Sequence, residues 1–67
     1  MAIYKVSYVI LESQHPGGII NLDERPIKGE ILQIGGVALE VVEVIELMPP
    51  RGEFYYIHAT CRICEEI

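Results

Sequence analysis

Hydrophobic and polar residues alternate at both ends of this chain with the two-residue period of a β-strand. In residues 2–11, one side of the pattern carries Tyr4, Val6, Tyr8 and Ile10, and the polar residues Lys5 and Ser7 begin the other. Successive side chains of a strand point to opposite faces, so this spacing predicts a partly buried strand. Residues 54–64 alternate in the same way, with an apolar side made of Tyr55, Ile57, Ala59, Cys61 and Ile63.

A Gly35-Gly36 dipeptide separates two more strand-forming segments, residues 30–34 and 37–47. A two-residue hairpin turn favours positive φ at its central positions, which glycine adopts without steric cost. This turn predicts a hairpin whose buried face carries Ile34, Val37, Leu32 and Leu39. The opposite face then holds Gln33, Ala38 and Glu40.

The next hairpin makes a conflicting demand on the strand that both hairpins share. If residues 48–53 form a symmetric connection, Val42 and Val44 lie on the buried face, opposite Ala59 and Ile57. The first hairpin, however, turns Leu39 inward. Leu39 is an odd-numbered position whereas Val42 and Val44 are even-numbered, so a regular strand cannot turn all three to the same face. A β-bulge inserts one residue and so switches the parity of a strand. We therefore predict a bulge near Val41-Val42.

A helix is the alternative for residues 38–47. Glu40, Glu43 and Glu46 would form one polar stripe at helical spacing. Four β-branched residues between Val41 and Ile45 disfavour a helix, because such side chains lose rotamer freedom there. The strand with a bulge is the preferred interpretation.

The order Gly29-Glu30-Ile31-Leu32-Gln33-Ile34-Gly35-Gly36, followed by Val41, Val42 and Val44, resembles the hairpin of small SH3-like barrel modules. The likeness covers about half of the chain and implies an architecture without an activity. A long bent strand shared by two hairpins is typical of small barrels. We predict an all-β fold, a small antiparallel SH3-like partly open barrel of about five strands, with residues 1–67 as a single domain.

Composition adds that part of the apolar surface should remain outside the core. The chain has 67 residues, 51% of them hydrophobic, whereas so short a domain buries only about 60% of its unfolded surface. An oligomer or a protein partner is therefore favoured. The net charge of −5 repels phosphate backbones and disfavours nucleic acid as a partner.

Localisation follows from features that the chain lacks. No apolar run approaches the roughly 18 residues of a membrane helix, so no membrane partner is expected. The N-terminal residues lack a basic start and a leucine-rich centre, which a signal peptide would have. We predict a cytoplasmic protein with free thiols.

A metal site is one candidate for chemistry. His58, Cys61 and Cys64 have His-x-x-Cys-x-x-Cys spacing, and His15 would supply a fourth ligand, a set that zinc accepts. In a regular strand, however, Cys61 points away from the other two and into the core. The preferred interpretation is a Cys61 that packs as a small hydrophobe, and zinc binding would require the strand to fray after Arg62.

Enzyme signatures are absent from the sequence pattern. The symmetric register predicts Glu43 opposite His58, an arrangement that stabilises a charged imidazole. No nucleophile or pocket is evident beside this pair, and no serine or threonine has an evident histidine and acid constellation. Neither Gly-Gly pair precedes the lysine and helix of a phosphate loop. We predict no enzyme activity and no cofactor.

The outward side of the second hairpin is the predicted binding face. Its residues are Glu43, Ile45, Leu47, Phe54, Tyr56, His58 and Arg62. A contiguous apolar and aromatic surface usually marks an interface. We predict a non-catalytic binding or assembly module that forms a homodimer or, second in preference, binds another protein. The alternatives are a small zinc-binding protein and, more weakly, a nucleic-acid-binding barrel, since only Arg51 and Arg62 are at hand to hold phosphates.

Overall fold

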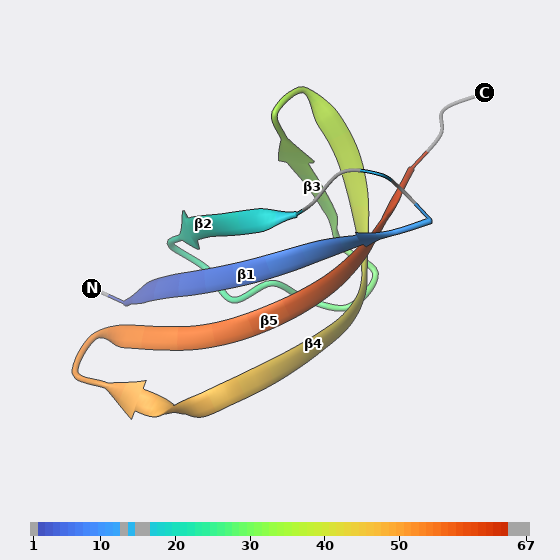
Figure 1. The fold of residues 1–67 in the computed structure, drawn as a ribbon. Helices are drawn as coiled ribbons and strands as arrows, with labels where there is room; N and C mark the ends of the chain where they lie inside the picture. Colours follow the sequence, from blue (N-terminus) through green and yellow to red (C-terminus); the bar gives the residue numbers. More distant parts are fainter. Residues whose placement is uncertain (1, 13, 15–16, 65–67) are drawn as a thin grey trace.

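The computed structural model describes residues 2–12, 14 and 17–64, and within them every regular element is a strand (Figure 1). None of these described residues forms a helix of the length and apolarity needed to cross a bilayer. The predicted all-β class is confirmed. The strands are β1 Ile3–Leu11, β2 Gly18–Leu22, β3 Ile31–Ile34, β4 Val37–Arg51 and β5 Phe54–Ile63.

The strands form one five-stranded sheet in the order β2-β1-β5-β4-β3. The sheet curls into a half-barrel (Figure 1), as expected for a small partly open barrel. Three neighbouring pairs are antiparallel, but all of β1 pairs in parallel with residues 54–62 of β5, so the sheet is mixed and not wholly antiparallel as predicted. The resemblance to SH3-like barrels concerned the first hairpin alone and stays a prediction.

The β3–β4 hairpin has the predicted register. Ile34 pairs with Val37 and Leu32 pairs with Leu39, and both turn glycines have positive φ, 59° and 79°. Leu39 is buried, but Val37 is 40% exposed. The tip of the hairpin therefore extends beyond the core, although its side chains have the expected orientation.

The predicted bulge lies in the middle of β4. Val41 pairs with Cys61 and Glu43 pairs with Thr60, so Val42 has no partner of its own in β5. Val41, not Val42, takes the fully buried position, and Val44 packs against the core beyond the bulge. The parity switch is confirmed, and the helical alternative for residues 38–47 is wrong because β4 is a strand throughout.

The β4–β5 connection is shorter than predicted. β4 continues through Pro49 and Pro50, and Arg51 pairs with Phe54 around a two-residue turn. Proline lacks the N–H that a ladder needs and is tolerated on an edge. The far edge of this part of β4 is free of β3, which pairs only with residues 37–40.

This longer strand changes the register of the second hairpin by two positions. Ile45, not Glu43, lies opposite His58, and Val44 lies opposite Ala59. The two-residue turn by itself would move the register by four positions, and the two register shifts on either side of Met48 take back two of them. The predicted Glu43–His58 pair is therefore wrong, but the inward and outward sides of β4 are unchanged because a shift of two preserves parity.

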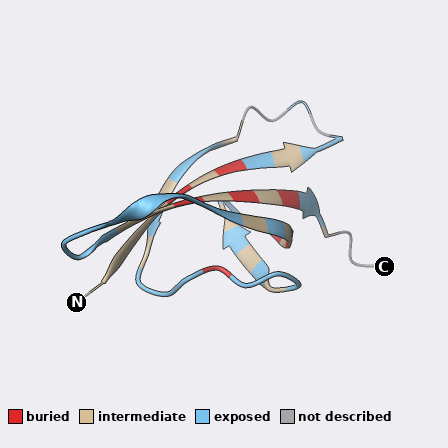
Figure 2. Cartoon of the chain, turned by 90° about the horizontal axis from the view of Figure 1, so that it is seen from below, coloured by how far each residue is buried: buried red, intermediate tan, exposed pale blue. Residues whose placement is uncertain are grey.

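The core lies on the inner side of the half-barrel. Figure 2 shows that the buried residues are concentrated along the middle of the central strands. The β2–β3 connection closes part of this side: Pro26 is buried, and Arg25 forms a 2.9 Å ion pair with Glu46 of β4. The buried hydrophobic side chains are Val6, Tyr8, Leu39, Val41, Ile57, Ala59 and Cys61.

Candidate functional site

The side of the sheet opposite the core is open to solvent, and we call it the outer face. Strand register assigns to it Lys5 and Ser7 of β1, Tyr56 and His58 of β5, and the β2 and β4 residues paired with them. Eleven large hydrophobic side chains are exposed among the described residues. Eight of these lie on the outer face, namely Val9, Leu11, Ile19, Ile31, Ile45, Leu47, Met48 and Phe54.

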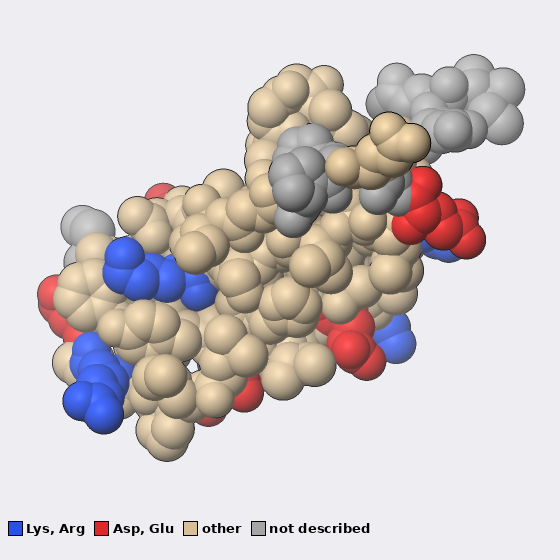
Figure 3. All heavy atoms as spheres, in the orientation of Figure 1, with Lys and Arg blue, Asp and Glu red and all other residues tan. Residues whose placement is uncertain are grey.

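All the side chains predicted for the binding face lie on the outer face. Ile45 is opposite His58, and Glu43 is opposite Thr60. The side chains of Phe54, Tyr56 and Arg62 lie on the same side of β5 as His58, because all are an even number of residues apart. Leu47 lies at the second register shift and shares a groove with Tyr56. In Figure 3 this surface is mostly uncharged in its middle, with charged side chains towards its ends.

A Ser7–His58 hydrogen bond lies at the centre of the outer face. The parallel pairing of β1 and β5 sets Ser7 beside His58, and the Ser7 Oγ to His58 Nδ1 distance is 2.9 Å. Sequence reasoning missed Ser7, because 51 residues separate the two and no local pattern indicates which strands pair. Within the described part of the chain no carboxylate is hydrogen-bonded to His58, so the pair lacks the third member of a catalytic triad. The bond holds the imidazole in place.

A groove crosses the outer face next to this pair. Its volume is about 290 Å³, and its lining comes from β1, β2, β4 and β5. Lys5 is at one side, with its Nζ 5.6 Å from the centre of the Phe54 ring, a separation at which a cation is attracted to an aromatic face. The lining residues are Lys5, Ser7, Ile19, Leu47, Tyr56 and Ile57.

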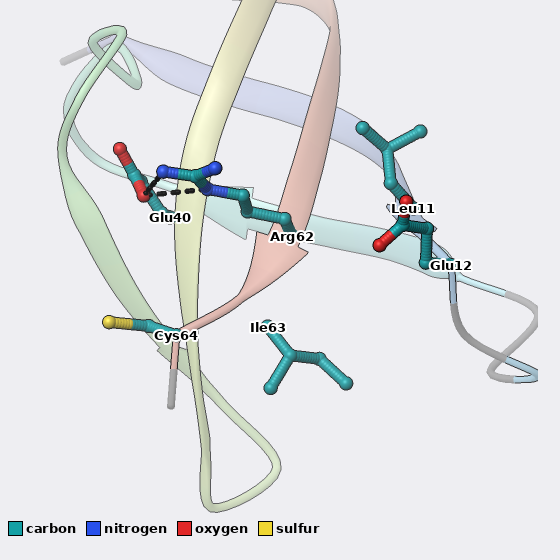
Figure 4. A pocket seen from close by; sticks show the side chains of 6 residues that line it. All are labelled: Leu11, Glu12, Glu40, Arg62, Ile63 and Cys64. Carbon is teal, nitrogen blue, oxygen red and sulfur yellow. Dashed lines mark hydrogen bonds and ion pairs between the residues drawn. The ribbon is translucent and has the colours of Figure 1, made fainter. Parts of the chain in front are cut away.

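A larger hollow of about 480 Å³ lies at the opposite end of the sheet (Figure 4). There Glu40 Oε1 contacts both Arg62 Nε at 2.8 Å and the terminal nitrogen at 2.7 Å. The Arg62 side chain is exposed and that of Glu40 is half-buried, so solvent screens the ion pair and it contributes little to stability. In Figure 4 the sulfur of Cys64 points away from Leu11 and Glu12. These side chains do not converge on a common point.

The residues of the zinc alternative are not brought together. Cys61 is fully buried in the core, whereas His58 lies on the outer face and Cys64 follows the end of β5. The described residues contain no group of three or more His, Cys, Asp or Glu side chains placed to hold a metal. His15, the proposed fourth ligand, lies outside the described residues. The strand alternation that placed Cys61 in the core explains why the motif does not close on a metal.

The two thiols should differ in reactivity. Burial raises the pKa of the Cys61 thiol above its usual 9.0, and only the thiolate is nucleophilic, whereas Cys64 is half-buried. At pH 8, one equivalent of thiol should react quickly with a disulfide reagent in the folded protein, and the second only after urea is added. Mass spectrometry of the modified peptides identifies the residue.

Cys64→Ser is the control, because it should remove the fast reaction and leave the slow one. The raised pKa also makes the stability of the fold depend on pH. As the pH rises above about 9, the unfolded chain releases the Cys61 proton before the folded chain does. This contribution to stability is present below that pH and is lost as the pH rises further. Equal rates for the two thiols in the folded protein would contradict the burial argument.

No protein-family model, curated protein or solved structure matches this chain. Of the surfaces described above, the outer face unites the predicted binding residues with the Ser7–His58 pair and the groove. It is the candidate functional site.

Proposed function

We propose that the protein is a non-catalytic binding or assembly module of the cytoplasm, and that it self-associates through the outer face. The observation that carries the proposal is the concentration of exposed hydrophobic side chains there, eight of the eleven found in the described residues. A sheet is stable when its apolar faces are buried against other parts of the protein or a partner. Here the core covers the inner face, and the apolar side chains of the outer face are left exposed. A contiguous apolar surface of this kind usually marks an interface.

The distribution of charge favours a second copy as the partner. Lys5 and Arg51 lie near the β4–β5 turn, alongside Tyr56 and Phe54, whereas Glu43 lies farther along the face beside Thr60. A two-fold axis through the face would set the cationic end of one copy against the acidic end of the other. Homodimers are built on such isologous contacts. The net charge of −5 argues against nucleic acid as the partner.

Leu47→Glu tests the interface. Leu47 is 56% exposed, so the change should leave the fold intact but place a carboxylate in each half of the contact. We expect the dimer dissociation constant, measured by sedimentation equilibrium, to rise at least about tenfold, equivalent to about 1.4 kcal/mol. Ile27→Glu is the matched control, because Ile27 is 64% exposed but lies in the β2–β3 connection.

The role of the charged ends is tested by salt. Attraction between exposed opposite charges weakens with ionic strength, so association of the unaltered protein should decrease between 50 mM and 500 mM NaCl. A protein that stays monomeric at every concentration, or equal effects of Leu47→Glu and Ile27→Glu, would overturn the proposal. If the protein is a monomer that binds another protein through the outer face, the face is an interface with a different partner and the proposal of self-association is wrong.

A further inference from the structure

The groove on the outer face has the form of a small-molecule site. The small side chain of Ser7 forms the floor of the groove. Larger side chains form its walls, with Ile19 on one side and Leu47 and Tyr56 on the other. The side chain of Ile57 is fully buried below the floor. The volume of about 290 Å³ is close to the lower end of ligand pockets, roughly 300 Å³. A small ligand fits this space and a nucleotide does not.

The polar groups of the groove favour an anion. Lys5 supplies an ammonium group, and Ser7 and Tyr56 carry hydroxyl groups that can donate hydrogen bonds. No acidic residue is part of the lining. Arg25 and Arg62 are paired with Glu46 and Glu40, whereas Lys5 lies over the Phe54 ring, which carries no formal charge to neutralise it. The groove is therefore complementary to negative charge in a chain that is acidic overall.

From this combination we infer that the groove binds a small monocarboxylate with an apolar tail. The carboxylate accepts one hydrogen bond from Lys5 and, with His58 Nδ1–H donating to Ser7 Oγ, a second from the Ser7 hydroxyl. The tail lies between Ile19 and Leu47. An inorganic anion would leave these apolar walls in water, and an uncharged alcohol would leave Lys5 without a counter-charge. Binding needs a single copy of the chain, so the inference does not depend on self-association.

Sodium octanoate is the probe, titrated into the ¹⁵N-labelled protein at a concentration where sedimentation shows a monomer. We expect saturable shifts of the amide signals of residues 5–7, 19 and 56, with a dissociation constant on the order of 1 mM, because the ligand is small and the groove open. Octanol should bind at least about tenfold more weakly, and octylammonium should give no saturable shift. These two probes have the same tail and differ in charge.

Lys5→Gln removes the cation and should weaken octanoate binding at least fivefold. Lys28→Gln is the matched control, because Lys28 lies in the β2–β3 connection and is exposed. Ser7→Val fills the floor at a strand position where a β-branched side chain is tolerated and should abolish the shifts, while a dispersed amide spectrum shows that the variant is folded. Absent saturation, equal binding of octanol, or equal effects of Lys5→Gln and Lys28→Gln would overturn the inference.

Discussion

Ile57→Ala should lower the free energy of unfolding by about 2 to 5 kcal/mol, the usual result of emptying a fully buried aliphatic site. Ile57 is completely buried in β5, the central strand of the sheet, between Val6 of β1 and Glu46 of β4. Both neighbouring strands contribute to the space it fills, so the cavity cannot close by movement of one of them. A chain of 67 residues has a total stability of only about 3 to 10 kcal/mol.

Urea denaturation followed by circular dichroism measures this effect. Ile63→Ala is the matched control: Ile63 belongs to the same strand and has the same parity, but it is 45% exposed. Its replacement should cost less than about 1 kcal/mol, because little apolar area leaves the protein interior. Similar losses for the two variants would mean that the core is not centred on the inner side of β5.

Gly17→Ala should be the most damaging of the glycine replacements. Gly17 has a φ of 80°, and a Cβ added there would lie 2.2 Å from the carbonyl oxygen of Tyr8. The positive φ alone costs an alanine about 1 to 2 kcal/mol, and relieving the overlap should add about 1 to 3 kcal/mol. Tyr8 pairs with Gly18 at the start of β2, so the required shift would separate β2 from β1.

Gly36→Ala separates the two contributions. Gly36 has a φ of 79°, but a Cβ there would meet no atom within 4 Å. Its replacement should therefore cost only the 1 to 2 kcal/mol of the backbone conformation. Equal losses of stability for Gly17→Ala and Gly36→Ala, again measured by urea denaturation, would show that the close approach to Tyr8 has no energetic consequence.

The bulge in β4 was predicted correctly, whereas the predicted register of the second hairpin was wrong, and the two outcomes have different physical causes. The bulge followed from a contradiction that the sequence itself contains, because the apolar residues before and after Val41-Val42 have opposite parities. The register of the second hairpin depended instead on where β4 ends and the turn begins, at Arg51. Pro49-Pro50 reads as a loop in isolation, but this part of β4 is free of β3, and its ladder with β5 is interrupted by the register shift between Met48 and Arg51, so the strand accepts both prolines.

The inward-facing side of each strand followed from the sequence, because alternation is a local property and a bulge reconciles two opposite parities, although the sequence did not decide that Val41 and not Val42 would be buried. Which strands lie side by side was decided by the tertiary structure. The parallel contact between β1 and β5 joins residues about 50 positions apart, and nothing local encodes it. That contact sets Ser7 against His58 and forms the groove beside Lys5. The outer face was therefore predictable from periodicity, whereas its chemistry emerged only when the two ends of the chain came together.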